Sequence, residues 1–304
     1  MGAGTIPRHR ILYYSPTDMS DSPIASPSDA PPASAEPVGA RVEARPLLGP
    51  DEPAPFEGFN PDGAAPLLLV CDHATRLLAR RLGTLGLSEA ELARHIAWDI
   101  GIAEVTRGLA RRLDAPAVLS RFSRLAIDPN RALDDPTLIP QLSDGVVIPG
   151  NRDLSPGDIQ ARIESFHRPY HEAIKRTLDA LAARGPAPAM VSMHSFTPVI
   201  KGVERPWHLG ILWDADPRLA RPLMARLRAL GVPVGDNQPY TARDGHGYTL
   251  FEHAAPRGLA HVLIEIRQDL IDTHHGAVAW TDRLADSLRV VLENAGVFRG
   301  ARFS

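Results

Sequence analysis

The chain has 304 residues, of which 44% are hydrophobic, and this is enough for one large α/β domain with a buried core. Its formal net charge is −3 and charges of both signs are interspersed, so the composition excludes the basic surface typical of proteins that bind nucleic acids or anionic membranes. The chain has no apolar run of roughly 18 residues, and its first residues lack the apolar core of a secretory signal, so we expect a cytoplasmic protein without membrane partners. Its single cysteine, Cys71, allows no disulfide within the chain, and its charge gives no reason to expect a nucleic-acid partner.

The first 55 residues differ in composition from the rest of the chain. They contain eleven of the 29 prolines, together with many serines, alanines and aspartates. Such a segment buries too little apolar surface to offset the entropy lost on ordering. We therefore predict a disordered leader over residues 1–55 and a single domain over residues 56–304. A regulatory tail is the functional alternative for the leader.

Strand and helix patterns alternate along the domain, which is typical of an α/β fold with a mostly parallel mixed sheet flanked by helices. Ser88 and Glu91 form a predicted capping box at one helix start, and Ser155 precedes another. The polar, proline-rich loop over about residues 126–153, which precedes the second of these helices, is too long for a simple connector. The predicted strands cover residues 66–71, 117–119, 189–194, 209–213 and 261–266; the predicted helices cover 88–113, 156–183, 217–230 and 276–295; a loop or short helix is expected at 247–255.

Two of the predicted strands lead to a histidine. The apolar residues 67–71 are followed by His73, and the apolar residues 189–191 lead to His194. Open α/β folds place their sites at the carboxyl ends of parallel strands. A histidine that only caps a strand end is the alternative for each position, but two of them favour a catalytic zinc site with three protein ligands.

The third ligand has three candidates, namely Asp72, His95 and Asp99. Asp72 is adjacent to His73, so on a strand its side chain would point to the opposite face. Asp99 lies in an apolar segment, where an unpartnered carboxylate is costly. We favour Asp99.

Glu265 lies between two isoleucines late in a predicted strand. A buried glutamate is costly unless it is paired or functional. The sequence leaves two interpretations: an ion pair with Arg267, or a general base that takes a proton from a metal-activated water.

Three arginines and an asparagine lie around the end of another predicted strand, at Arg121, Arg124, Asn130 and Arg131. The planar guanidinium fork suits carboxylates, so the cluster predicts a substrate with a free carboxylate. One arginine could also stabilise an oxyanion. A solvated arginine cluster is the alternative.

His167 and His171 have the i, i+4 spacing of a zinc-binding helix, but Arg168 stands where the HExxH motif has glutamate, so we favour a packing role or a role in supporting the site residues. The glycine-rich stretch 245–249 contains Tyr248 and could cover a site; a plain turn is equally compatible.

Five motifs occur in order along the chain: Cys-Asp-His-Ala at 71–74, His-Ile-Ala-Trp-Asp-Ile-Gly at 95–101, Arg-Phe-Ser-Arg-Leu-Ala-Ile-Asp-Pro-Asn-Arg at 121–131, Met-His-Ser-Phe-Thr-Pro at 193–198 and Glu-Ile-Arg-Gln-Asp-Leu at 265–270. Together they resemble the N-formylglutamate amidohydrolase family over about residues 66–295. That family is similar in fold to the zinc carboxypeptidases and aspartoacylases, so the resemblance implies a phosphorylase/hydrolase-like α/β sheet.

The resemblance also implies roles for individual residues. His73 and His194 would bind zinc, Glu265 would be the general base, Arg124 would stabilise the oxyanion, and Asn130 and Arg131 would bind the substrate carboxylate. We add Arg121 and Tyr248 as candidate substrate-binding residues. Carboxypeptidases have a glutamate three residues after the first histidine, whereas this chain has Arg76, which leaves Asp99 as the expected third ligand.

The implied activity is zinc-dependent hydrolysis of an N-acyl amino acid, with N-formyl-L-glutamate as the first candidate substrate, yielding formate and glutamate in amino-acid degradation. The chain has Asp72-His73-Ala74-Thr75 where the histidine-degradation enzymes have Pro-His-Ala-Gly, which indicates a sister branch. A related metallopeptidase or N-acyl-amino-acid deacylase, or a non-catalytic binding protein on the same fold, are the alternatives.

Overall fold

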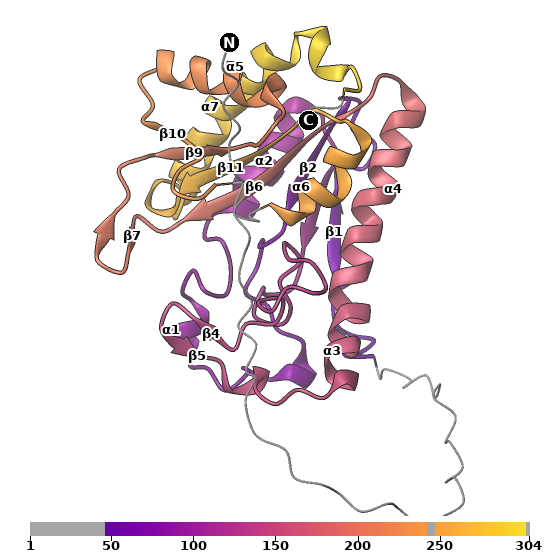
Figure 1. Cartoon of the computed structure of the whole chain (residues 1–304), viewed down its shortest axis with the longest axis vertical. Helices are drawn as coiled ribbons and strands as arrows, with labels where there is room; N and C mark the ends of the chain where they lie inside the picture. Colours follow the sequence, from indigo (N-terminus) through magenta and orange to yellow (C-terminus); the bar gives the residue numbers. More distant parts are fainter. Residues whose placement is uncertain (1–45, 242–246, 302–304) are drawn as a thin grey trace, which may run out of the picture. The chain divides into compact units, whose positions relative to one another are not determined.

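The structure of the protein is a computed structural model that describes residues 46–241 and 247–301 (Figure 1). Its centre is a seven-stranded sheet formed by β1 (Phe56–Phe59), β2 (Leu67–Cys71), β3 (Ala117–Ser120), β6 (Ala189–Phe196), β9 (Leu209–Leu212), β10 (Val234–Asp236) and β11 (His261–Arg267). The strands lie in the order β1-β3-β2-β6-β11-β9-β10. β1 pairs antiparallel with β3, and β9 pairs antiparallel with β11, whereas the other four pairings are parallel. The prediction of a mostly parallel mixed sheet is therefore confirmed.

Helices cover both faces of this sheet, as its alternating side chains require. The helices of the described part are α1 (Glu89–Leu92), α2 (Ile102–Leu113), α3 (Pro156–Arg162), α4 (Arg168–Arg184), α5 (Pro217–Ala229), α6 (Tyr248–His253) and α7 (His274–Leu292). In β2, Leu67 and Leu69 pack in one core with α2, α5 and α7, whereas Leu68 and Val70 pack in a second core with α4 and α6. No helix within the described residues is both long and apolar enough to cross a membrane.

The prediction of one helix over residues 88–113 is wrong, because the chain forms two helices there. The capping box of Ser88 and Glu91 is present at α1, but α1 ends at Leu92 and α2 begins only at Ile102. Gly101 has a φ of +79°, and a Cβ at this position would lie 2.1 Å from the carbonyl oxygen of Ile271. The helical pattern of the sequence therefore continues across a break, and at the end of this break Gly101 packs closely against Ile271.

The predicted helix over 156–183 is present, with a change of winding in its middle. Residues Ile163–His167 form a π-helical turn between α3 and α4. This turn places Pro169 in the first turn of α4, where proline is tolerated. π-turns of this kind frequently mark functional sites, and this one carries His167.

Two short hairpins extend from the loops of the domain. The predicted loop around residues 126–153 contains β4 (Leu142–Ser143) and β5 (Val146–Val147), and β7 (Val199–Ile200) pairs with β8 (Val203–Glu204) just after β6.

Residues 46–55 of the predicted leader contact the domain. The Leu47 amide donates to Ser165 Oγ at 3.3 Å, and Glu52 accepts from the amides of Gly49 and Arg80 at 2.8 Å. The remainder of the predicted leader, residues 1–45, lies outside the described residues.

Candidate active site

Three neighbouring parallel strands bring the predicted site residues to one edge of the sheet. His73 lies two residues beyond β2, His194 lies near the end of β6, and Glu265 lies near the end of β11. The register pairs Glu265 directly with His194, so both side chains leave the sheet on the same face.

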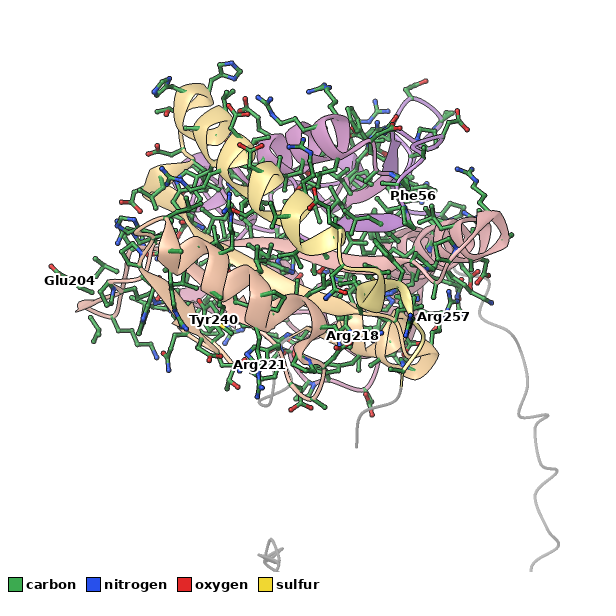
Figure 2. All side chains as sticks on the ribbon, turned by 90° about the horizontal axis from the view of Figure 1, so that it is seen from above. Phe56, Glu204, Arg218, Arg221, Tyr240 and Arg257 are labelled. Atoms are coloured by element: carbon green, nitrogen blue, oxygen red, sulfur yellow. The ribbon has the colours of Figure 1, made fainter. Side chains whose placement is uncertain are left out.

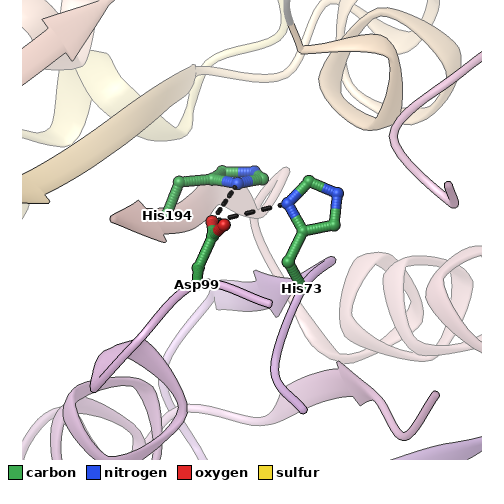
Figure 3. Close-up of side chains that lie close together, drawn as sticks. All are labelled: His73, Asp99 and His194. Atoms are coloured by element: carbon green, nitrogen blue, oxygen red, sulfur yellow. Dashed lines mark hydrogen bonds and ion pairs between the residues drawn. The ribbon is translucent and has the colours of Figure 1, made fainter. Parts of the chain in front are cut away.

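His73, Asp99 and His194 converge on one point, as Figure 3 shows. Asp99 Oδ2 lies 2.9 Å from Nδ1 of His194 and 3.4 Å from Nδ1 of His73. All three side chains are buried, and one ligand atom from each lies within 4.8 Å of the others. Two imidazole nitrogens and one carboxylate, with room for a fourth ligand, are a typical donor set for catalytic zinc.

Two further aspartates hold the outer ring nitrogens of these histidines. Asp128 Oδ1 lies 2.7 Å from Nε2 of His73, and Asp72 Oδ2 lies 3.0 Å from Nε2 of His194. A proton on each Nε2 would satisfy these carboxylates and leave the Nδ1 lone pairs directed at Asp99. Of the three candidates for the third ligand, Asp99 is thus the one between the two Nδ1 atoms, and Asp72 lies behind His194.

The third candidate, His95, lies at the wall of the site. Its Nε2 is 3.5 Å from Asp144 Oδ2, and it does not belong to the cluster of possible ligands.

Asp72 is an anchored carboxylate. It accepts hydrogen bonds from the hydroxyls of Tyr170 and Thr249, both at 2.8 Å, and from Ser192 at 3.2 Å. Burial alone would raise the pKa of Asp72, but the hydrogen bond and the charge of His194 lower it to about 2. Asp72 therefore stays ionised and fixes the orientation of His194.

The charges of the cluster fit a divalent cation. Burial would raise the pKa values of Asp99 and Asp128, but neighbouring His73 and Arg124 lower them, so both are ionised. With Asp72 there are three carboxylates, and Arg124 supplies one compensating charge, donating to Asp128 at 2.8 Å and to Asp99 at 3.5 Å. Burial would lower the pKa values of His73 and His194, but the neighbouring aspartates raise them, so without an ion both rings favour their protonated forms. A divalent ion would take the place of these protons, and with neutral histidines it would balance the two remaining negative charges.

Glu265 lies beside this cluster with an unsatisfied oxygen. Its Oε2 is buried and has no hydrogen-bond partner among the described residues. The whole residue is only 7% exposed. Burial raises the pKa of Glu265 to about 7, against the lowering effect of His194. The alternative of an ion pair with Arg267 is wrong, because Arg267 binds Asp269 at 2.8 Å instead.

Asn130 and Arg131 follow Asp128 on a loop that histidines hold in place. His167 Nε2 lies 3.0 Å from the carbonyl oxygen of Arg131, and His171 Nε2 lies 2.9 Å from that of Pro129. Burial lowers the pKa of His171 to about 3, so its ring is neutral. The two histidines thus contact the backbone of the loop that carries Asn130 and Arg131.

A cavity of about 400 Å³ opens at this edge of the sheet. The predicted site residues that line it are His73, Asp99, Arg124, Asn130, Arg131, His194 and Glu265. Its walls also include residues that sequence reasoning did not select, notably Asp128, Lys201, Tyr240 and Gln268. The position of Asp128 in the Asp-Pro-Asn-Arg motif could have indicated from the sequence that it belongs to the site. Tyr240 lies in no motif that would have indicated this.

Arg121 and Tyr248, predicted as substrate-binding residues, do not line this cavity. Arg121 follows β3 and its guanidinium lies 3.8 Å from Glu57 of the neighbouring strand β1. Tyr248 begins α6, and its ring packs 5.4 Å from that of His171. Part of the glycine-rich stretch 245–249, residues 245–246, lies outside the described residues.

Comparisons with known proteins identify a family and two similar structures. Residues 65–272 match the family described as N-formylglutamate amidohydrolase. A crystal structure of a gene product from Agrobacterium tumefaciens is 36% identical and superposes with a TM-score of 0.80, covering 82% of this chain and 99% of the other. The crystal structure of N-formylglutamate amidohydrolase from Ralstonia eutropha JMP134 is 22% identical, with a TM-score of 0.64 and coverage of 78% and 97%, which shows a shared fold. No curated protein matches the chain.

The family match covers more than half of the chain and confirms the resemblance found in its motifs. The chain therefore belongs to the N-formylglutamate amidohydrolase family.

Proposed function

We propose that the protein is a zinc-dependent amidohydrolase that cleaves the amide bond of an N-acyl amino acid, with N-formyl-L-glutamate as the first candidate substrate. The observation that carries this proposal is the buried group His73, Asp99 and His194 beside Glu265, whose Oε2 has no hydrogen-bond partner among the described residues. Membership of the amidohydrolase family supports the reaction class.

His73, Asp99 and His194 would hold the ion, and when bound it would supply Lewis-acid polarisation of the scissile carbonyl. Glu265 would take the proton of the attacking water and deliver it to the nitrogen of the leaving amine. A carboxyl group whose pKa is about 7 suits both halves of this transfer, because it gains and loses a proton readily near neutral pH.

The cations of the cavity would bind and orient the substrate. Arg124 lies against Asp99 and Asp128 and would stabilise the carbonyl oxygen as negative charge develops on it. Asn130 and Arg131 would bind the substrate carboxylate, because an amide and a guanidinium can donate several hydrogen bonds to one carboxylate. The loop contacts of His167 and His171 keep this pair in place.

The second candidate is a deacylase for N-acyl amino acids with larger acyl groups. The cavity of about 400 Å³ favours it, because pockets of this size also accept ligands larger than a formylated amino acid.

Product release from a set of substrates tests both candidates. The wild type, incubated with N-formyl-L-glutamate, N-formyl-L-aspartate and N-acetyl-L-glutamate, should release the acid and the amino acid from at least one of them. Chelation should abolish this release and zinc should restore it. Faster cleavage of the acetyl than of the formyl substrate would favour the second candidate. No hydrolysis of any member after zinc loading, or a fully active Glu265→Gln variant, would contradict the proposal.

A further inference from the structure

Tyr240 is the described tyrosine that lines the cavity, and a buried arginine lies against it. The guanidinium carbon of Arg205 lies 4.9 Å from the centre of the Tyr240 ring and 5.7 Å from that of Phe196. Phe196 ends β6, two residues after His194, and also lines the cavity. Arg205 thus connects the end of a site-bearing strand to the Tyr240 ring (labelled in Figure 2).

Arg205 is fixed by its backbone and has an unusual environment for a buried cation. It is 7% exposed, its amide donates to the carbonyl of Pro198 at 2.8 Å, and its own carbonyl accepts from Arg267 at 3.2 Å. Its guanidinium donates to the Thr197 carbonyl at 3.3 Å and has no carboxylate within ion-pair distance in the described part of the chain. Because burying a cation is costly without compensation, the two aromatic rings and the Thr197 carbonyl are the described groups that offset this cost.

Tyr240 lines the same cavity as Glu265, the candidate base, and Arg124, the candidate oxyanion arginine. Burial, and then the negative charge of Glu265, raise the pKa of Tyr240 above its ordinary value, and a hydrogen bond with Arg205 acts in the opposite direction. The phenol also interacts electrostatically with Arg124. At neutral pH, Tyr240 is therefore a neutral hydroxyl donor in the cavity that holds the candidate base and the candidate oxyanion arginine.

We propose that Tyr240 is a further catalytic residue that donates a hydrogen bond to the scissile carbonyl oxygen as it becomes negative, and that Arg205 is the positioning residue that holds the phenol there. This inference rests on the proposed amide hydrolysis at the same site. A hydroxyl that binds the developing oxyanion stabilises the transition state more than the bound substrate, so its loss lowers kcat more than it changes KM.

A double-mutant cycle tests whether Arg205 acts through Tyr240. With the best substrate of the panel, Tyr240→Phe should lower kcat by about 10- to 100-fold with KM changed less than about threefold. Arg205→Met should have a similar effect on kcat, because the phenol loses its support. In the double variant, Arg205→Met should add less than about twofold to the loss caused by Tyr240→Phe. Multiplicative losses, or full activity of Tyr240→Phe, would overturn the proposal.

Arg221→Met is the matched control. Arg221 lies on α5 with its guanidinium 5.4 Å from the Trp213 ring, so this variant also removes a cation–π contact, but Arg221 does not line the cavity. It should keep the kcat of the wild type. Thermal unfolding of all variants shows whether each is folded.

A spectroscopic readout separates this proposal from the proposed function. The ultraviolet absorbance of the phenolate, taken as the difference between wild type and Tyr240→Phe, reports the titration of Tyr240. Removing the positive charge in Arg205→Met should shift this titration to higher pH, and an unchanged titration would overturn the positioning role. If the wild type hydrolyses no substrate, the proposed function and the catalytic role of Tyr240 both fail, whereas the titration still decides whether Arg205 holds the phenol.

Discussion

Two aspartates outside the ligand group determine how the site histidines present their nitrogens. Asp128 and Asp72 lie on the Nε2 side of His73 and His194, and Asp99 lies on the Nδ1 side. A carboxylate behind a ligating histidine fixes the tautomer and raises the basicity of the ring. The residue-scale chemistry of the site therefore depends on more acids than the ion itself would contact.

Replacing Asp128 should weaken metal binding without removing a ligand. Asp128→Ala takes away the 2.7 Å contact with His73 Nε2, so we expect the affinity for zinc to fall by about 10- to 100-fold. Competition with a chromogenic chelator measures this. Asp144→Ala is the control, because Asp144 lines the same cavity but binds Arg94 and His95. Equal zinc affinity in wild type and Asp128→Ala would contradict the assigned role.

Glu265 should limit activity at acidic pH. A general base must be ionised, and the pKa of Glu265 is raised by burial to about 7. We therefore expect kcat/KM to fall about tenfold per pH unit below that value and to level off above it. A value of kcat/KM that stays constant between pH 5 and 8 would exclude Glu265 as the base.

The same residue should destabilise the fold at alkaline pH. Its carboxyl titrates at about 7 in the folded chain against 4.5 as its ordinary value, so ionisation favours the unfolded chain as pH rises through this window. Below pH 4.5 the cost is absent, and above pH 7 it is complete, at about 3 kcal/mol for the metal-free protein. Metal-free Glu265→Gln should thus unfold at higher denaturant than metal-free wild type at pH 8 and at nearly equal denaturant at pH 4.

At the scale of elements, the break between α1 and α2 places Asp99 at the site. Gly101 ends this break with a φ of +79°, and the Asp99 amide donates to the carbonyl of His73 at 3.0 Å. A continuous helix across these residues would leave no such bond. The helical pattern of the sequence did not reveal this interruption. The interruption brings Asp99, the expected third ligand, beside His73.

Gly101→Ala should damage both fold and site. A Cβ would lie 2.1 Å from the Ile271 carbonyl oxygen, so we expect a loss of unfolding free energy of about 3 kcal/mol or more, together with weaker metal binding. Gly145→Ala is the matched control: its φ is +77°, but a Cβ there meets nothing within 4 Å. That variant should lose about 1 kcal/mol from backbone strain alone. Chemical denaturation compares the two, and equal losses would refute the steric explanation.

The sequence was sufficient for the elements whose pattern is local. The apolar runs before His73 and His194 predicted buried strands, and parallel strands bring their carboxyl ends to one edge, so the two histidines were expected to meet. The direct pairing of Glu265 with His194 depends on the order of strands in the sheet, which a single sequence does not display.

The remaining differences come from tertiary packing. Arg121 and Arg124 are three residues apart, yet one turns toward β1 and the other into the cavity, because the chain bends after β3. Tyr240 lines the cavity and packs against Arg205, which lies 35 positions earlier in the sequence. Neither orientation follows from residue type or spacing.

At the scale of the whole molecule, the described contacts of the N-terminal segment begin at Pro46. Arg81 donates to the Pro46 carbonyl at 2.7 Å, and Leu47 and Leu48 pack against a small apolar cluster that includes Phe122. We propose that residues 1–41 are dispensable for folding and hydrolysis, as their composition predicts.

Two truncations test this boundary. Removal of residues 1–41 should leave the unfolding temperature and kcat/KM unchanged within error, whereas removal of residues 1–55 should lower the unfolding temperature by several degrees, because it also removes the Leu47 and Glu52 contacts. A large loss of stability or activity in the shorter truncation would assign the leader a role in the fold or in catalysis.

Metal content tests the central claim most directly. Protein purified without chelator and loaded with zinc should contain about one ion per chain, and His194→Ala should lose it, since one of three ligands is gone. His95→Ala should keep it, because His95 lies on the cavity wall beside Asp144. A wild type that binds no divalent metal even after loading, or a folded His194→Ala that binds it equally well, would contradict the account.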